Sequence, residues 1–83
     1  MEIPTGWQKS ADGQALEKSF TFADFSEAFG LLTRVAMQAE KVDHHPEFTS
    51  RWNRVDFRLT SHDSGRITQR DLDLARAIDE FAS

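Results

Sequence analysis

The sequence predicts an α+β fold, a four-stranded antiparallel sheet with helices packed on one face. Two segments alternate apolar and polar residues as half-buried strands do, residues 15–22 and residues 55–59. Two other segments repeat apolar residues at helical spacing, residues 24–43 and residues 68–82. The resulting order of strand, strand, helix, strand, strand, helix favours hairpins, and hairpins favour an antiparallel sheet with helices against one face.

The first two strands are predicted to form a hairpin. Residues 7–10 are a weak strand candidate, and Asp12-Gly13 is typical of a hairpin turn because both residues tolerate positive φ. The following strand, residues 15–22, alternates apolar and polar side chains, with Lys18 as the exception on its apolar face.

A long helix is predicted to begin at Asp24. This side chain can accept hydrogen bonds from the first turn, and Glu27 can reach back in the manner of a capping box. Pro46 disfavours helical backbone at the residue before it, so the helix is expected to end near Asp43 or His44. The face predicted to pack on the sheet consists of Phe25, Ala28, Phe29, Leu32, Ala36 and Ala39.

Two strands and a helix complete the predicted fold. Residues 47–52 predict a short strand that turns at Asn53 into the strand over residues 55–59. A loop over residues 61–67 leads to Thr68, which can cap the last helix. The predicted buried face of that helix consists of Leu74, Ala75, Ile78, Phe81 and Ala82.

Composition indicates one small domain, residues 1–83, without a nucleic-acid or membrane signature. A net charge of −4 disfavours nucleic acid as a partner, because phosphate binding needs a positive surface. No apolar run approaches the roughly 20 residues of a membrane span. Cysteine is absent, which excludes disulfides and cysteine-based metal sites. No signal-peptide pattern is visible either, so we expect a cytoplasmic protein, with an organellar one as the alternative.

Three histidines are the candidate chemical groups. His44 and His45 stand at the predicted helix-to-strand corner, where side chains can project into a cleft. His62 lies in the predicted loop, and Asp71 follows it nine positions later. Imidazole exchanges protons near neutral pH, so clustered histidines predict acid–base chemistry. Taken alone, the same residues are also compatible with a hydrogen-bonded surface turn and a helix cap.

Zinc is a further possibility for three histidines, but the spacing argues against it. Adjacent residues of an extended chain point to opposite faces, so His44 and His45 would not readily share one ion. We therefore expect no zinc site.

Several blocks of sequence occur in the order found in a known family. The first half contains Gly6-Trp7, Leu16-x-x-x-Phe20-x-Phe22 and Asp24-Phe25-x-x-Ala28-Phe29. The second half contains Glu40-Lys41-x-Asp43-His44-His45-Pro46-Glu47, Trp52-Asn53-x-Val55 and His62-Asp63-x-Gly65-x-Ile67-Thr68-x-x-Asp71. Over nearly its whole length the chain thus resembles the pterin-4a-carbinolamine dehydratases. The resemblance implies a four-stranded sheet backed by helices, with the family's N-terminal helix expected to be absent here.

The resemblance also implies an active site and a reaction. The implied catalytic residues are His44, His45, His62 and Asp71. The implied substrate-binding residues are Glu40, Asp43, His44, His45, Phe48, Thr60, Ser61, His62 and Asp63. The implied reaction removes water from 4a-hydroxytetrahydropterin to give quinonoid dihydropterin, a step of tetrahydrobiopterin recycling. Histidines can supply an acid for the leaving hydroxyl and a base for a ring N–H, so the implied elimination is expected to need no metal and no nucleotide or organic cofactor. We expect His44 and His62 to transfer protons and His45 to bind the pterin.

Two positions depart from the family pattern. Phe48 stands where tryptophan is common, which keeps an aromatic wall but loses an N–H donor. Arg66 stands where glycine is usual. If this position needs positive φ, arginine is strained there; if it does not, the side chain lies at the rim of the pocket.

Partners follow from chain length and from the resemblance. A chain this short is marginally stable alone, so we expect a homodimer or homotetramer, with Leu72, outside the predicted buried face, contacting another subunit. The implied functional partner is an aromatic amino acid hydroxylase. The alternative functions are a protein-binding module of the transcriptional dimerisation-cofactor type and a dehydratase of molybdopterin metabolism.

Overall fold

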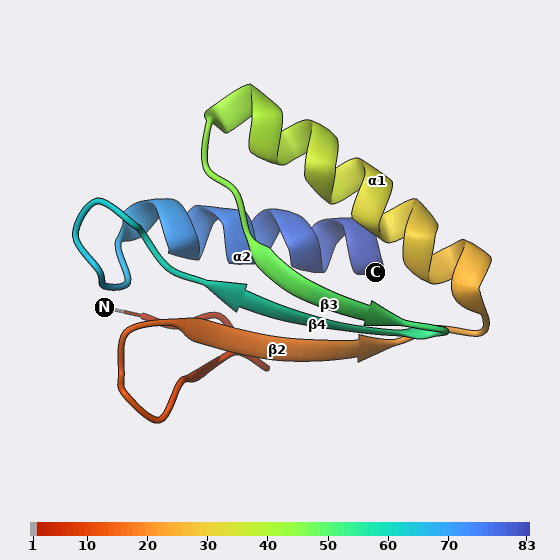
Figure 1. Cartoon of the computed structure of the whole chain (residues 1–83), viewed down its shortest axis with the longest axis horizontal. Helices are drawn as coiled ribbons and strands as arrows, with labels where there is room; N and C mark the ends of the chain where they lie inside the picture. Colours follow the sequence, from red (N-terminus) through yellow and green to blue (C-terminus); the bar gives the residue numbers. More distant parts are fainter. Residues whose placement is uncertain (1) are drawn as a thin grey trace.

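Two helices cover one face of a four-stranded antiparallel sheet in the computed structural model, which describes residues 2–83 (Figure 1). Met1 of the predicted domain lies outside the described residues. The elements are β1 Gln8–Lys9, β2 Leu16–Thr21, α1 Phe25–Val42, β3 Glu47–Arg51, β4 Arg54–Leu59 and α2 Gln69–Ala82. The strand order is β1-β2-β4-β3, with every pair antiparallel. The predicted α+β fold is confirmed.

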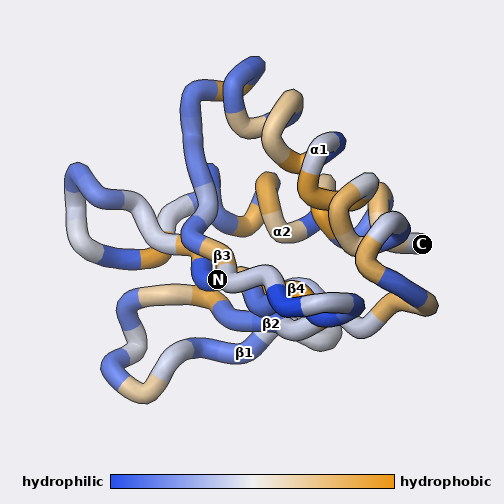
Figure 2. The backbone as a smooth tube through the Cα atoms, turned by 45° about the vertical axis from the view of Figure 1, so that its right-hand side comes forward, coloured by the Kyte–Doolittle hydropathy of each residue, from blue (hydrophilic) through white to orange (hydrophobic). Residues whose placement is uncertain are grey.

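The hydrophobic core lies between the sheet and the two helices. Alternation in β4 sends Val55, Phe57 and Leu59 toward the helices, and all three are buried. The buried residues of α1 are Ala28, Leu31, Leu32, Val35 and Ala39. Those of α2 include Leu72, Leu74, Ala75 and Ile78. In Figure 2 the hydrophobic colour is accordingly concentrated along the helices, whereas the loop between β4 and α2 is mostly hydrophilic.

The helices begin and end near the predicted residues. Asp24 Oδ1 accepts a hydrogen bond from the backbone N–H of Glu27 at 2.9 Å, which fixes the start of α1. The helix ends at Val42, and Asp43 adopts the left-handed conformation with φ 53°. In α2, the carboxylate of Asp71 accepts from the backbone N–H of Thr68 at 2.9 Å, one half of the predicted capping box.

The structure corrects the buried faces predicted for both helices. Phe25, Phe29 and Ala36 of the predicted α1 face are exposed, while Leu31 and Val35, not included in the prediction, are buried. Helix α1 therefore has two apolar faces, of which only one packs on the sheet.

Leu72 of α2 was also placed wrongly by the sequence pattern. It is buried in the core of its own chain and is not available to a partner. Leu72 belongs to the same core cluster as Leu74, Ala75 and Ile78, so a residue outside the main stripe is still covered.

Lys18 is the polar exception on the helix-facing side of β2, and the structure gives its reason. Lys18 Nζ lies 2.7 Å from Asp79 Oδ1 of α2 and 4.7 Å from the centre of the Phe20 ring. The indole N–H of Trp7 donates to the same Asp79 carboxylate at 3.1 Å. These contacts attach the N-terminal residues to α2.

The β3–β4 hairpin turns through Trp52 and Asn53. Trp52 has φ 50°, an uncommon conformation for a bulky residue, and is 66% exposed. The Asn53 side-chain amide donates to the Phe22 carbonyl at 2.9 Å, and the Phe22 N–H donates to the Asn53 carbonyl at 2.8 Å. Both bonds hold the turn against the segment that leads into α1.

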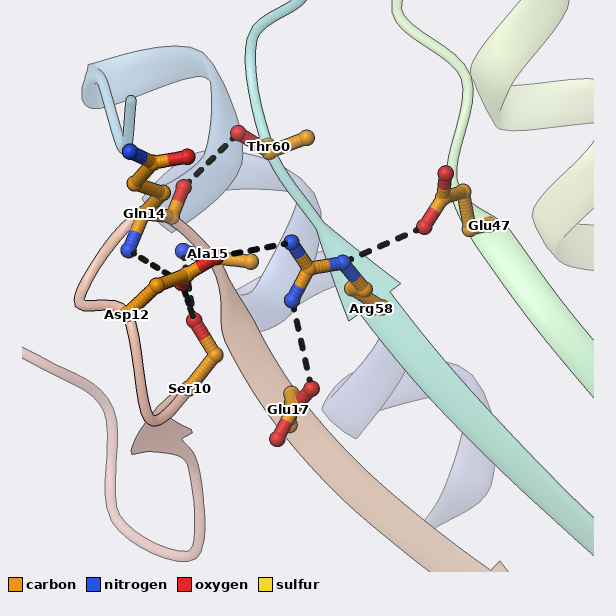
Figure 3. Close-up of polar contacts among 8 residues, drawn as sticks. All are labelled: Ser10, Asp12, Gln14, Ala15, Glu17, Glu47, Arg58 and Thr60. Atoms are coloured by element: carbon orange, nitrogen blue, oxygen red, sulfur yellow. Dashed lines mark hydrogen bonds and ion pairs between the residues drawn. The ribbon is translucent and has the colours of Figure 1, made fainter. Parts of the chain in front are cut away.

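The other face of the sheet is polar and contains an ion-pair network around Arg58 (Figure 3). The Arg58 guanidinium lies 3.3 Å from both Glu17 and Glu47 and 3.7 Å from Asp12. The Ser10 hydroxyl, the Gln14 N–H and then Arg58 lower the pKa of Asp12 below its usual value. The charges along this part of the sheet are thus paired with each other across β2, β4 and β3.

Candidate functional site

The histidine pair lies at the corner between α1 and β3. The left-handed Asp43 turns the chain sharply, and the backbone N–H of His44 still donates to the Ala39 carbonyl at 3.1 Å. The chain then extends through Pro46 into β3, so successive side chains point in opposite directions. His44 is consequently only 7% exposed, while His45 is exposed to solvent.

His44 is held by a completely buried carboxylate. Its Nε2 lies 2.6 Å from Oδ1 of Asp71, which has 0% exposure. A carboxylate only accepts hydrogen bonds, so Nε2 carries the proton and donates it, leaving Nδ1 as the nitrogen available for proton exchange. This contact fixes the orientation of the His44 ring relative to α2.

The second oxygen of Asp71 is fixed by the loop before α2. Oδ2 accepts from the Ser61 hydroxyl at 2.9 Å and from the Thr68 backbone N–H at 2.9 Å. The Thr68 hydroxyl lies 2.7 Å from Ser61 Oγ and extends this network. The capping signal in the sequence thus places a buried carboxylate at the start of α2, where the positive end of the helix dipole favours it.

His45 has a carboxylate partner of a different kind. Its Nε2 donates to Oε1 of Glu40 at 2.7 Å, and both side chains are largely exposed. This bond also leaves Nδ1 without a role in the pair. Because the bond is exposed to solvent, it constrains the His45 ring less than the buried bond constrains His44.

His62 lies in the turn that follows β4. The backbone N–H groups of Ser64 and Gly65 donate to the Ser61 carbonyl at 3.2 and 2.8 Å, and Ser61 N–H donates to the Arg66 carbonyl at 3.1 Å. The turn leaves His62 exposed at its tip. Positive φ is found at Gly65, with 64°, and not at Arg66. Of the two alternatives for Arg66, the strained one is therefore excluded.

One cavity brings the two loops together. It has a volume of about 190 Å³ and is lined by Asp43, His44, His45, Ser61, His62, Asp63 and Arg70. Six of the predicted site residues thus surround one space, although they come from segments separated along the chain. Glu40 and Asp71 contact its histidines from outside the cavity lining.

Two predicted binding residues lie elsewhere. The Thr60 hydroxyl donates to the Gln14 carbonyl at 2.7 Å and ties β4 to the first hairpin (Figure 3). Phe48 lies on the edge strand β3, beside Phe57, and lines an apolar groove against α1.

Arg70 is a residue of this site that the sequence prediction missed. Its guanidinium donates to the backbone carbonyl of Asp43 and so joins the first turn of α2 to the histidine corner. It also places a positive charge in the wall of the cavity. A basic residue next to Asp71 in the first turn of a helix, where the dipole disfavours it, was the available signal.

The described residues provide neither a metal cluster nor a membrane span. Within residues 2–83, no group of three or more histidine, aspartate or glutamate side chains is arranged to hold an ion. In the same part of the chain, neither helix combines the length and the apolar character that crossing a bilayer requires. The chemistry that the site offers is proton transfer by imidazole, with carboxylates that orient the rings.

Two solved structures resemble this fold. A transcriptional coactivator/pterin dehydratase from Brucella melitensis superposes with a TM-score of 0.93 at 43% identity, over 95% of this chain and 84% of that chain. A pterin dehydratase-like protein identified as a RuBisCO assembly factor of the alpha-carboxysome superposes with a TM-score of 0.81 at 19% identity, over 94% of this chain and 90% of that chain. The second likeness concerns the fold alone.

Sequence comparison gives the family. A protein from Rhizorhabdus wittichii, provisionally named a pterin-4-alpha-carbinolamine dehydratase, is 51% identical over 92% of this chain and 78% of its own length. A protein from Novosphingobium aromaticivorans with the same provisional name is 49% identical over 96% of this chain and 82% of its own length. The family model described as pterin 4 alpha carbinolamine dehydratase matches residues 1–81. The chain therefore belongs to the pterin 4 alpha carbinolamine dehydratase family.

Proposed function

We propose that this protein dehydrates 4a-hydroxytetrahydropterins to quinonoid dihydropterins by histidine acid–base catalysis. The observation that supports this most directly is the His44–Asp71 pair, a hydrogen bond of 2.6 Å with a completely buried carboxylate, in the wall of a cavity that two further histidines line. Asp71 also caps α2, but its other oxygen, Oδ1, is directed at the imidazole and orients that ring, as acid–base catalysis by His44 would use.

The proposed reaction needs two proton transfers and no cofactor. The bond between C4a and its hydroxyl oxygen breaks, and a histidine acid protonates the leaving oxygen so that it departs as water. A second histidine accepts the proton of a ring N–H, and the electron pair of that bond forms the new double bond of the quinonoid ring. The products are one water and one quinonoid dihydropterin.

The three histidines differ in their suitability for these roles. His44 is held through Nε2 by Asp71, which leaves Nδ1 for proton exchange, and His62 lines the same cavity from the other loop. We assign proton transfer to these two residues and pterin binding to His45, whose ring is held only by a solvent-exposed bond to Glu40. Asp71 orients the His44 ring and is a positioning residue.

Kinetics of dehydration on three variants test the proposal. His44→Ala and His62→Ala should each lower kcat by about 10²–10⁴, the range for loss of one general acid or base. His45→Ala should act mainly on KM, because uniform binding affects substrate and transition state equally. Glu80→Gln, an exposed change at the end of α2, serves as the control. If folded His44→Ala and His62→Ala proteins both retain the wild-type kcat, the acid–base assignment is refuted and a protein-binding role becomes the better hypothesis.

The proposed setting is recycling of tetrahydropterin for an aromatic amino acid hydroxylase. The carbinolamine is the product that such a hydroxylase would release, so coupling the two enzymes should sustain hydroxylation at low pterin concentration. The alternative is a dehydratase of molybdopterin metabolism. It would be favoured if a pterin of that metabolism gave a higher kcat/KM than 4a-hydroxytetrahydrobiopterin.

A further inference from the structure

The turn between β1 and β2 contains a dipeptide that is open to a backbone rearrangement. Asp12 is followed by Gly13, which has no side chain to hinder attack by its own nitrogen on the preceding carboxyl group. Both residues are exposed, and a Cβ atom added to Gly13 would have no heavy atom within 4 Å. Neighbouring side chains therefore do not shield this peptide, so any protection has to come from the hydrogen bonds of the turn.

The rearrangement is isomerisation of Asp12 through a cyclic imide. The Gly13 nitrogen attacks Cγ of the Asp12 carboxyl group and forms a C–N bond, the nitrogen gives up its proton, and the carboxyl hydroxyl leaves as water. One water then opens the ring at either of its carbonyl carbons, which gives aspartate or isoaspartate with no net change in mass. Ring closure needs a free nitrogen and a protonated carboxyl group, because hydroxyl leaves a protonated carboxyl group more readily than oxygen leaves a carboxylate.

The folded turn engages both reacting groups (Figure 3). The Ser10 hydroxyl donates to Oδ1 of Asp12 at 2.5 Å, and the Gln14 backbone N–H donates to the same oxygen at 3.0 Å. The Gly13 backbone N–H donates to the Ser10 carbonyl at 2.9 Å. Two bonds thus hold the carboxylate and one holds the nitrogen, so all three must break before the ring can close.

Ser10 and Arg58 connect this protection to the rest of the hairpin and sheet. Ser10 is buried, its backbone N–H donates to the Ala15 carbonyl at 2.8 Å, and its hydroxyl oxygen accepts from the Ala15 N–H at 3.1 Å. The Arg58 guanidinium of β4 lies 3.7 Å from Oδ2 of Asp12. The Ser10 hydroxyl, the Gln14 N–H and then Arg58 lower the pKa of Asp12, so less of this carboxyl group is protonated than in an unfolded chain.

We propose that Asp12–Gly13 is an isoaspartate site that the folded β1–β2 hairpin keeps closed. Isomerisation should then occur in chains whose hairpin has opened and be suppressed in the intact fold. Isoaspartate adds one carbon atom to the main chain, so the turn could not re-form the bonds from Ser10 and Gln14 to the displaced carboxylate. The modification would therefore mark chains that have been open, independently of the dehydratase function.

The rate of isomerisation in the folded protein is compared with that in a synthetic peptide of residues 10–18. Trypsin cleavage after Lys9 and Lys18 releases the same peptide from the incubated protein, and liquid chromatography separates its aspartate and isoaspartate forms, which have equal mass. The folded protein should isomerise at least about tenfold more slowly than the peptide, because only the fraction of molecules with an open hairpin can react.

Three variants of the full chain test the hydrogen bonds. Ser10→Ala removes one donor to Asp12 and should accelerate isomerisation in the folded protein by about two- to tenfold, the effect of one hydrogen bond. Arg58→Gln removes the nearby positive charge and should accelerate it by a smaller factor. Ser26→Ala, a change at an exposed serine of α1, is the matched control and should leave the rate unchanged.

Circular dichroism of each variant decides which comparison counts. A folded wild-type protein that isomerises as fast as the peptide overturns the proposal, and so does a folded Ser10→Ala protein that isomerises as slowly as the wild type. If Ser10→Ala does not fold, Arg58→Gln takes its place: a faster rate than in the wild type supports the proposal, and an equal rate overturns it.

Discussion

The Asp71 side chain acts on both the stability of α2 and the orientation of His44. Its carboxylate accepts three hydrogen bonds while it is completely buried, from His44, Ser61 and Thr68. An amide at this position has one oxygen in place of two, so one of these donors must face an NH₂ group. That donor would be buried without an acceptor, and its desolvation would then lower the free energy of unfolding.

Asp71→Asn should therefore reduce stability and activity together. We expect the free energy of unfolding to fall by roughly 1–3 kcal/mol, and kcat to fall because the His44 ring loses its fixed orientation. Urea unfolding and dehydration kinetics measure the two effects. Asp73→Asn, an exposed carboxylate of the same helix, is the stability control and should change the unfolding free energy by less than about 0.5 kcal/mol. Equal losses in the two variants would contradict the structural role of Asp71.

Arg70 is the other residue whose effect extends beyond its own position. Its bond to the Asp43 carbonyl braces the left-handed corner that immediately precedes His44. Arg70→Gln should lower kcat/KM for dehydration by about tenfold, the loss of one hydrogen bond to a charged group. Arg70→Lys should recover part of the activity, because it keeps the charge but not the planar fork. Equal activity of the glutamine, lysine and wild-type proteins would show that the corner holds without Arg70.

At the scale of elements, the turn between β4 and α2 contains two neighbouring residues with different backbone conformations, Gly65 and Arg66. Gly65 has φ 64°, and a Cβ atom added to it would have no heavy atom within 4 Å, so a methyl group there would meet only conformational strain. Arg66, next to it, does not have positive φ. A side chain should therefore lower the stability of the fold at position 65 and raise it at position 66.

Gly65→Ala should lower stability by about 1–2 kcal/mol, the cost of left-handed backbone for a residue with a side chain. Arg66→Gly should also lower stability, by about 0.4–1 kcal/mol, because it adds freedom to the unfolded chain without relieving strain. Thermal unfolding measures both. A higher melting temperature for Arg66→Gly would mean that the arginine is strained after all.

Local signals in the sequence predicted the elements well, and non-local packing explains the errors. Asp24 and Pro46 define where α1 starts and stops, and both act on their immediate neighbours. Phe29 and Val35 show the limit: α1 has two apolar faces, and the choice between them depends on the sheet, which lies elsewhere in the sequence. The same holds for Leu72, which the fold covers although the helical pattern leaves it outside the main face.

In the candidate site, too, the sequence indicated the residue types, whereas the contacts between them depend on packing. Family resemblance identified the histidines and Asp71, but the contact between His44 and Asp71 joins positions 27 residues apart and depends on how the two helices dock. Arg70 was missed because its bond is to a backbone carbonyl, and its one signal in the sequence is a basic residue in the first turn of a helix. The resemblance also implied Thr60 as a binding residue, which stays a prediction; its hydroxyl is bonded to the first hairpin, and Thr60 is not among the residues that line the cavity.

At the scale of the whole molecule, the uncovered face of α1 and the edge strand β3 are the surface best suited to self-association. All five residues of β3 are exposed, and a groove of about 540 Å³ between this strand and α1 is lined largely by apolar groups, including Phe25, Phe29 and Met37. Unpaired strand edges and large apolar patches both favour pairing with another chain. Since β3 starts directly after the histidine corner, association here would also stiffen the site.

We expect a homodimer or homotetramer at micromolar concentration. Light scattering should give a mass above the monomer value of 9.5 kDa. Phe29→Lys should shift the mass toward the monomer without unfolding the chain, because this side chain is 56% exposed within one subunit. Glu80→Lys, an exposed change on α2, should leave the mass unchanged. A wild-type protein that stays monomeric and active over the whole range would refute the expectation.

The contrasting environments of the two tryptophans give the molecule a pair of built-in fluorescent probes. Trp7 is 5% exposed, packs against Phe20 and Phe57, and binds Asp79 through its indole N–H, so its emission should report the loss of the core. Trp52 is 66% exposed at the tip of the β3–β4 turn, next to the edge strand, so its emission should respond to anything that covers that end of the sheet. In a Trp52→Phe protein the remaining signal follows unfolding alone. The difference between this spectrum and that of the wild type then isolates the surface signal, and one titration of protein concentration can follow assembly and folding separately.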